Sequence, residues 1–266
     1  MLSILTLNVQ AAALPRAERL LAWLDARHDS VTILTETSNG PGTAHLLTQC
    51  RTAGLAVVHT PSADRDRGCA IISKLPLTPT PDLLPAVTLP GRAVAVTLDT
   101  TPAITVLGIY VPSSDRAPDK IAKKRAFLTS VLDGLRQLTD EQRAHLVLGG
   151  DYNVISRDHQ PRYPAFLPFE YDFLDALSHL GLTDAHQHLH PDVQEHSWIG
   201  RGGNGYRFDY LHTGADLTPQ LAACAYLHEP REGRLTDHAA VSATLQVDIG
   251  SPVTTTSPLL DTATLF

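Results

Sequence analysis

The sequence predicts a globular α/β fold, because about ten short apolar strands alternate with about four amphipathic helices along its 266 residues. Polar side chains directly follow several of the strands. The clearest case is Leu146 to Leu148, a buried strand that two glycines end before Asp151 and Asn153. Loops at strand ends form concave sites. We therefore expect an α/β domain with a polar site at one end of its strands.

Composition limits the classes of function. Apolar residues make up 43% of the chain and charged residues 18%, and the formal net charge is -7. Binding to nucleic acid would then need a local basic face or bound cations. The sequence shows no basic leader before a long apolar run and no apolar stretch of about 18 residues. Its three cysteines form no CxxC pair. We expect a cytoplasmic protein that does not insert into membranes.

Composition changes near the end of the sequence. Residues 249–266 are rich in threonine, serine and proline and contain no lysine or arginine. Such segments bury little apolar surface. We expect residues 1–248 to form one domain and residues 249–266 to form a loosely packed tail.

Strands earlier in the chain also end in polar residues. Asn8 and Gln10 follow the first strand and could orient a phosphate or a metal ligand. Glu36 ends the second strand and could bind a metal or cap a turn. Tyr110 lies at the end of a later strand, where packing is the usual role of tyrosine. Each residue alone has an ordinary structural explanation, whereas their shared position indicates a site.

We expect residues 206–211 to form an aromatic strand with Asp209 inside it, where an unpaired buried carboxylate would be costly. Asp237 and His238 precede the strand 239–245. A hydrogen bond from His238 to Asp209 would fix the imidazole tautomer and raise its basicity. We expect this pair, although Asp237 or His238 alone could simply cap a strand.

The clearest amphipathic helix covers residues 117–137. One side is apolar, and the other carries a basic cluster that includes Lys123 and Lys124, with Arg116 just before the helix. This cluster could contact a phosphate backbone. A solvated helix face is the alternative.

Taken together, the sequence blocks around these residues resemble the endonuclease/exonuclease/phosphatase family, in particular exonuclease III and the abasic-site endonucleases. The resemblance implies a four-layer α/β/β/α sandwich, in which helices flank two facing mixed sheets, and a catalytic domain over residues 1–248. The blocks that carry the resemblance, in chain order, are Leu7 to Gln10, Leu34 to Thr37, Gly68 to Lys74, Gly108 to Pro112, Gly149 to Asn153, Tyr206 to Tyr210 and Thr236 to His238.

The resemblance also implies roles for the polar residues. Phosphodiesters are negatively charged and repel hydroxide, so a divalent cation and an imidazolium must offset that charge. We expect Mg²⁺, with Mn²⁺ as a substitute. The expected residues are a catalytic set of Tyr110, Asp151, Asn153, Asp209 and His238, a metal set of Asn8, Glu36 and Asp237, and a substrate-binding set of Gln10, Lys123, Lys124, Trp198, Tyr206 and Phe208.

The substrate is open at this point. A DNA phosphodiesterase of the abasic-site endonuclease or 3′-exonuclease type is favoured by the blocks, the basic helix and the aromatics, which could form a pocket for a baseless sugar or simply pack in the core. The net charge and the compact region 156–169 favour a phosphatase or phosphodiesterase for a small molecule, nucleotide or lipid headgroup. A non-catalytic binding relative is disfavoured, because no catalytic position is replaced. We expect a monomer without an obligate protein partner.

Overall fold

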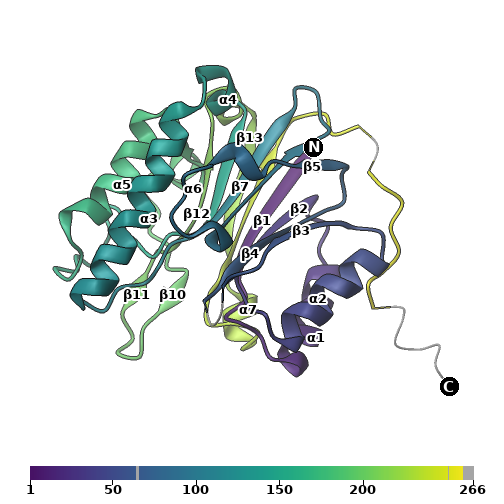
Figure 1. The fold of residues 1–266 in the computed structure, drawn as a ribbon, viewed down its shortest axis with the longest axis horizontal. Helices are drawn as coiled ribbons and strands as arrows, with labels where there is room; N and C mark the ends of the chain where they lie inside the picture. Colours follow the sequence, from purple (N-terminus) through teal and green to yellow (C-terminus); the bar gives the residue numbers. More distant parts are fainter. Residues whose placement is uncertain (64–65, 251, 260–266) are drawn as a thin grey trace.

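Four layers make up the structure, a computed structural model that describes residues 1–63, 66–250 and 252–259 (Figure 1). Within these residues, two six-stranded mixed sheets face each other, and helices cover the outer face of each. The predicted α/β/β/α sandwich is confirmed. No helix of the described residues is long and apolar enough to span a membrane.

The first sheet combines both ends of the chain. β1 pairs in parallel with β2 and antiparallel with β14, so strands from the beginning and the end of the sequence are neighbours. The order of strands across this sheet is β13 (Leu221–Leu227), β14 (Ala240–Leu245), β1 (Leu2–Asn8), β2 (Val31–Thr37), β4 (Gly68–Ser73) and β3 (Ala56–Thr60).

The second sheet comes from the middle of the chain. β7 and β8 are parallel, and its other neighbouring strands are antiparallel. β6 and β7 are antiparallel neighbours, with Ala93 opposite Ile109 and Leu98 opposite Ile104. The order across this sheet is β5 (Leu77–Pro79), β6 (Ala93–Leu98), β7 (Ile104–Tyr110), β8 (Leu146–Asp151), β12 (Asp209–Thr213) and β9 (Thr183–Asp184).

Helices cover the outer faces (Figure 1). Apolar side chains of α1 and α2 pack on the first sheet, and those of α3 and α5 pack on the second. Short elements complete the chain, including the hairpin of β10 (Trp198–Ile199) and β11 (Gly205–Tyr206). The helices are α1 (Leu14–Asp25), α2 (Pro41–Thr52), α3 (Pro118–Gln137), α4 (Asp140–Ala144), α5 (Pro168–His179), α6 (Ala185–Leu189) and α7 (Glu229–Glu232), with 3₁₀ turns at Pro81–Leu83, Pro90–Arg92 and Thr218–Gln220.

The alternation of side chains along β1 separates two cores. Leu2 and Ile4 point between the sheets, whereas Leu5 and Leu7 point outward to α1 and α2. The same alternation in β8 sends Val147 between the sheets and its neighbours toward α3 and α5. Each strand is therefore buried on both faces, which explains why its sequence is apolar almost throughout.

Glycines allow the two sheets to approach each other at the centre. A Cβ on Gly108 would lie 2.6 Å from Cγ2 of Ile33, and one on Gly149 would lie 3.0 Å from Cδ1 of the same isoleucine. Gly108 and Gly149 are on the second sheet and Ile33 is on the first. The isoleucine therefore occupies space that side chains at the two glycine positions would take.

Two sequence-based expectations differ from the structure. The segment 206–211 is not one strand, because β11 ends at Tyr206 and β12 begins at Asp209. Asp209 therefore starts a strand and does not lie within one. Residues 207–208 lie between the two strands. There the backbone amides of Phe208 and Asp209 donate to the hydroxyl of Ser197.

The second difference concerns the tail. Its described part is tied to the first half of the domain, and not loosely packed: the amide of Val253 donates to the carbonyl of Lys74, and Ser257 Oγ donates to Asp25 across 2.7 Å. These bonds fasten the segment beside α1. Residues 251 and 260–266 of the predicted tail lie outside the described residues.

Gly150 gives a test of the packing in the second sheet. Its φ is +140°, and a Cβ there would lie 1.9 Å from the carbonyl oxygen of Ile109, which is backbone and cannot move aside. We expect Gly150→Ala to lower the free energy of unfolding by about 2–5 kcal/mol, the combined cost of strain and overpacking. Urea unfolding measures this change. Gly202→Ala is the control, because a Cβ there meets no atom within 4 Å; equal midpoints for the two variants would contradict the argument.

Candidate active site

Strand alternation brings four of the predicted residues between the sheets. Asn8 shares the inner face of β1 with Leu2 and Ile4, and Asp151 shares the inner face of β8 with Val147. In the same way, Tyr110 lies on the inner face of β7 and Asp209 on that of β12. All four are buried. The alternation of side chains that builds the core between the sheets therefore also places these polar groups together at one end of that core.

Glu36 reaches the site by a different route. Strict alternation would place its side chain on the outer face with Leu34. Instead, Glu36 has a φ of +54°, and the pairing of β2 with β4 shifts register between Leu34 and Thr37. A left-handed conformation in a non-glycine residue is uncommon and marks functional sites. The irregularity turns the carboxylate toward Tyr110, whose hydroxyl donates to Glu36 Oε1 across 2.6 Å.

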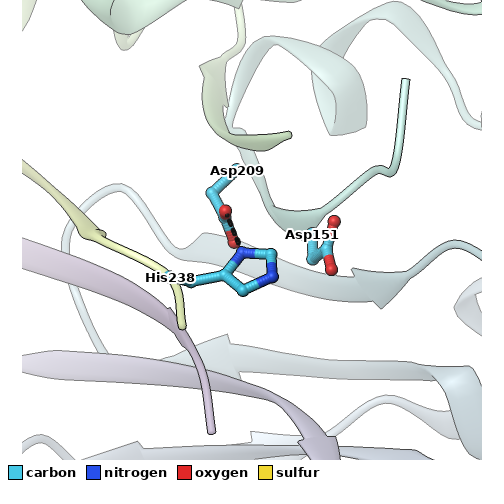
Figure 2. Close-up of side chains that lie close together, drawn as sticks. All are labelled: Asp151, Asp209 and His238. Carbon is cyan, nitrogen blue, oxygen red and sulfur yellow. Dashed lines mark hydrogen bonds and ion pairs between the residues drawn. The ribbon is translucent and has the colours of Figure 1, made fainter. Parts of the chain in front are cut away.

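Hydrogen bonds between the predicted residues cross from one sheet to the other. Asn8 Nδ2 of the first sheet donates to Asp151 Oδ2 of the second across 2.9 Å. His238 Nδ1, just before β14, lies 2.7 Å from Asp209 Oδ2 at the start of β12 (Figure 2). The predicted Asp209–His238 pair is therefore present in the structure. The site forms only where both sheets meet.

Asp151 is held by its neighbour Asn153 as well. The backbone amide of Asn153 donates to Asp151 Oδ1 across 2.9 Å, and its side-chain Nδ2 donates to Asp151 Oδ2 and to the carbonyl of Val111. Burial, followed by the negative charge of Asp209, raises the pKa of the Asp151 carboxyl to about 8. The hydrogen bonds thus fix the orientation of the Asp151 carboxylate, whereas its surroundings stabilise its negative charge poorly.

His238 lies between two carboxylates. Figure 2 shows the ring with Asp209 at one nitrogen and Asp151 beside it. Burial opposes the imidazolium, but the charge and hydrogen bond of Asp209 outweigh burial and raise the pKa of His238 to about 10. His238 is therefore protonated at neutral pH. The other ring nitrogen of His238, Nε2, lies 3.5 Å from the side-chain Nδ2 of Asn8.

Arg92, which the sequence did not single out, supports Tyr110. Its guanidinium lies 4.3 Å from the centroid of the Tyr110 ring and donates to the Tyr110 carbonyl. It also forms an ion pair with Asp66. Burial and the charge of Glu36 raise the pKa of the Tyr110 hydroxyl. Tyr110 thus remains a proton donor in a fixed orientation.

A pocket of about 790 Å³ opens onto these residues. Glu36, Tyr110, Asp151, Asp237 and His238 line one part of it. Aromatic side chains line another part, namely Trp198, Phe208 and Phe166. Phe166 belongs to the loop before α5 and was missed, because a loop aromatic gives no periodic signal.

The predicted aromatic residues stack on one another. Trp198 and Phe208 lie with ring centroids 5.8 Å apart and an interplanar angle of 28°, and Tyr206 stacks on Phe208 at 5.2 Å. Trp198 also donates from Nε1 to Asp237 Oδ2 across 3.0 Å. Tyr206 thus lies behind the wall that Trp198 and Phe208 form, and the wall is tied to an acidic residue of the site.

The other predicted substrate residues differ from expectation in their surroundings. Lys124 is not on a solvated face: it is 1% exposed and paired with Glu170 in the lining of the pocket. Lys123 is half-exposed and forms an ion pair with Asp66. The side chain of Gln10 accepts from Arg16. The sequence-based view of α3 missed these acidic partners because they come from distant segments.

The chemistry of the donor set fits a hard divalent cation. Asp237 Oδ1 is buried and accepts no hydrogen bond from any residue the structure describes. Glu36, whose Oε1 is bound by Tyr110, lines the pocket together with Asp237. Carboxylate oxygens are the ligands that Mg²⁺ and Mn²⁺ prefer.

Asp151, Asp209 and His238 have potential ligand atoms within 4.8 Å of one another. However, His238 Nδ1 and Asp209 Oδ2 are already bonded to each other. Oxygen ligands also suit Mg²⁺ better than imidazole does. The donor set that best fits a cation therefore centres on the carboxylates that line the pocket.

Comparison with known proteins agrees with this geometry. The profile of the Endonuclease/Exonuclease/phosphatase family matches residues 5–240. The chain belongs to this family, and the resemblance inferred from the sequence blocks is confirmed. A comparison with curated proteins gives no match.

Solved structures show the same fold at low sequence identity. A 3′ phosphatase from Neisseria, bound to a product DNA hairpin, matches with a TM-score of 0.76 and 21% identity over 92% of this chain and 100% of its own. An AP endonuclease from Archaeoglobus fulgidus matches with a TM-score of 0.74 and 20% identity, over 93% of this chain and 100% of its own. A 3′-5′ exonuclease from Neisseria meningitidis matches with a TM-score of 0.74 and 22% identity, over 92% of this chain and 99% of its own.

The Asp209–His238 pair predicts a change in titration. In the metal-free protein, Asp209→Asn removes the negative charge that holds the imidazole proton, so the pKa of His238 should fall well below its value of about 10. Titration of the ring by NMR measures this. Asp133→Asn, an exposed residue of α3, is the control. An unchanged titration of His238 in Asp209→Asn would sink the assignment.

The same pair affects stability with a definite sign. The pKa of His238 in the folded protein lies above the ordinary histidine value of about 6.5. The stabilisation is therefore complete below about pH 6.5 and is lost as the pH rises toward 10. Asp209→Asn should remove this dependence from unfolding curves measured across that range.

Proposed function

We propose that this protein is a divalent-metal-dependent phosphodiesterase that hydrolyses DNA, of the abasic-site endonuclease or 3′-exonuclease type. The proposal is supported mainly by one pocket that joins a phosphate-handling wall to an aromatic wall. Asp151, Tyr110 and His238 belong to the first wall, and Trp198 and Phe208 belong to the second. A nucleotide bound there would place its phosphate against the first wall and its sugar against the aromatic wall.

The residues at the phosphate have separable roles. His238 and Tyr110 carry protons and offset the charge that develops on the phosphoryl oxygens. In the metal-free protein the charge and hydrogen bond of Asp209 raise the pKa of His238 and favour its protonated form. We therefore assign acceptance of the proton of the attacking water to Asp151. Asn8 and Asn153 hold the Asp151 carboxylate in place.

A divalent cation would be held by Glu36 and Asp237, with Asn8 nearby. It would supply Lewis-acid polarisation of the phosphate and offset the negative charge of the site. Such a cation would also lower the pKa of Asp151, which would leave this carboxyl ionised and able to take a proton at neutral pH.

The aromatic wall favours DNA that lacks a base. Trp198, Phe208 and Phe166 offer flat apolar surfaces to a sugar turned out of the helix. The similar structures described above include an AP endonuclease and a phosphatase bound to DNA, which supports the same substrate class.

A small phosphoester is the second candidate, and the charge of the protein favours it. The net charge is -7. The lysines of α3 that could have contacted DNA phosphates form ion pairs with nearby carboxylates instead. These ion pairs are Lys120 with Asp115, Lys123 with Asp66 and Lys124 with Glu170.

Cleavage assays distinguish the two substrates. With Mg²⁺, we expect incision of a labelled duplex at a single abasic-site analogue, little cleavage of the undamaged duplex, and little turnover of phosphomonoesters or nucleotides. Trp198→Ala and Phe208→Ala should reduce lesion incision by about 10- to 100-fold, since burying an apolar surface the size of a side chain is worth roughly 1.5–3 kcal/mol. Turnover of small phosphates alone would keep the site chemistry and reject DNA as substrate.

Metal dependence has its own test. EDTA should abolish activity, and Mg²⁺ or Mn²⁺ should restore it, because the site gathers carboxylates that would otherwise repel the substrate. Restoration is measured by titrating each metal into the stripped enzyme, with Ca²⁺ as a size control. Full activity in EDTA would rule out the proposed metal chemistry.

Single substitutions test the protein's own groups. Asp151→Asn and His238→Ala should each lower kcat by about 10²–10⁴-fold, the usual contribution of positioned proton-transfer groups. Circular dichroism would check that both variants are folded, and His188→Ala, an exposed position on α6, is the matched control. Near-normal turnover by either site variant would remove that residue from the mechanism.

A further inference from the structure

The ion pair between Lys124 and Glu170 lies in the lining of the pocket. The two side chains are 2% and 4% exposed and come from α3 and α5. Removing two charges from water is costly, and a hydrophobic pair at such positions is often as stable or more stable. Stability alone therefore does not account for charged residues here.

The contacts of Lys124 lead to the site. Its Nζ donates to Glu170 Oε1 and also to the backbone carbonyl of Asn153, across 2.6 Å. Glu170 uses its other carboxylate oxygen to accept from the amide of Leu167, at the end of the loop that carries Phe166. One buried pair thus joins α3, the start of α5 and the residue that holds Asp151.

The backbone of Asn153 is left-handed. Its φ is +49°, a conformation that asparagine adopts more readily than most other non-glycine residues. That conformation lets both the backbone amide and the side-chain Nδ2 of Asn153 donate to Asp151. If the Asn153 carbonyl lost its partner, the peptide could relax, and both bonds to Asp151 would change direction.

We propose that Lys124, held by Glu170, is a positioning residue that fixes the left-handed backbone of Asn153 and, through it, the Asp151 carboxylate. The inference rests on the proposed function, since the positioned groups are those assigned to phosphoester hydrolysis. Lys124 thus acts from a buried position in the lining of the pocket, in contrast to the basic residue at the surface that its sequence position predicts.

The double variant Lys124→Met/Glu170→Leu separates positioning from stability. It removes both charges together, so no unpaired charge is left buried. The Asn153 carbonyl and the Leu167 amide lose these partners, which lowers the melting temperature, so kcat is measured well below the melting temperatures of both proteins. We expect kcat on the best phosphoester substrate to fall by about 100-fold, with KM changed less than threefold, because misplacing a reacting group by about 1 Å has an effect of this size. Arg157→Met, which removes an exposed ion pair to α5, is the matched control.

A crystal structure of the double variant provides a readout that does not depend on activity. We expect φ of Asn153 to leave the left-handed region and its bonds to Asp151 to break. A wild-type φ together with wild-type kcat would overturn the proposal. If the wild-type protein hydrolysed no phosphoester, the proposed function would fail, whereas the conformation of Asn153 would still decide the positioning role.

Single variants decide the question if the double variant does not fold. Assayed well below their melting temperatures, Glu170→Gln should retain most of kcat, because Lys124 can still donate to Asn153, whereas Lys124→Met should lose it. Equal losses, or no loss in either variant, would overturn the proposal by showing that the pair serves general packing only.

Discussion

The structure depends on side-chain hydrogen bonds that cross from one sheet to the other at a single end of the sandwich. Asn8 bonds to Asp151 in this way, and Glu36 accepts from the tyrosine at the end of β7. Because each bond has one partner in each sheet, the spacing of the sheets sets the geometry of the site. The glycines opposite Ile33 set that spacing, so core packing and site geometry are one constraint.

Charge is the second organising factor. The site concentrates carboxylates in a buried place, where the imidazolium of His238 faces Asp151. The charged side chain of Lys124 also interacts with Asp151, and that of Arg16 interacts with Asp237 and Glu36. Burial is the main cause of the raised pKa of Asp151, and the charge of Asp209 adds to it. Burial therefore affects the electrostatics of Asp151 more than any single neighbouring charge does.

Much of the site follows from the sequence, and the rest depends on contacts that no local pattern reveals. The period of two in the strands places Asn8 and Asp151 between the sheets, so their meeting could be predicted. The orientation of Glu36 could not, because it depends on a local left-handed residue. Likewise, Phe166 comes from an irregular loop, and the burial of Lys124 requires a carboxylate 46 positions away. Periodicity predicts faces well, but it does not predict the partners of single polar groups.

The pairing of β1 with β14 also bears on how the site comes into being during translation. β1 leaves the ribosome long before β14, so the edge of β1 that pairs with β14 stays open until the later strand has been made. The same late segment supplies Asp237 and His238, so a partial chain lacks both an acidic residue of the candidate site and its imidazole. The candidate site can therefore be assembled only after most of the domain has been synthesised.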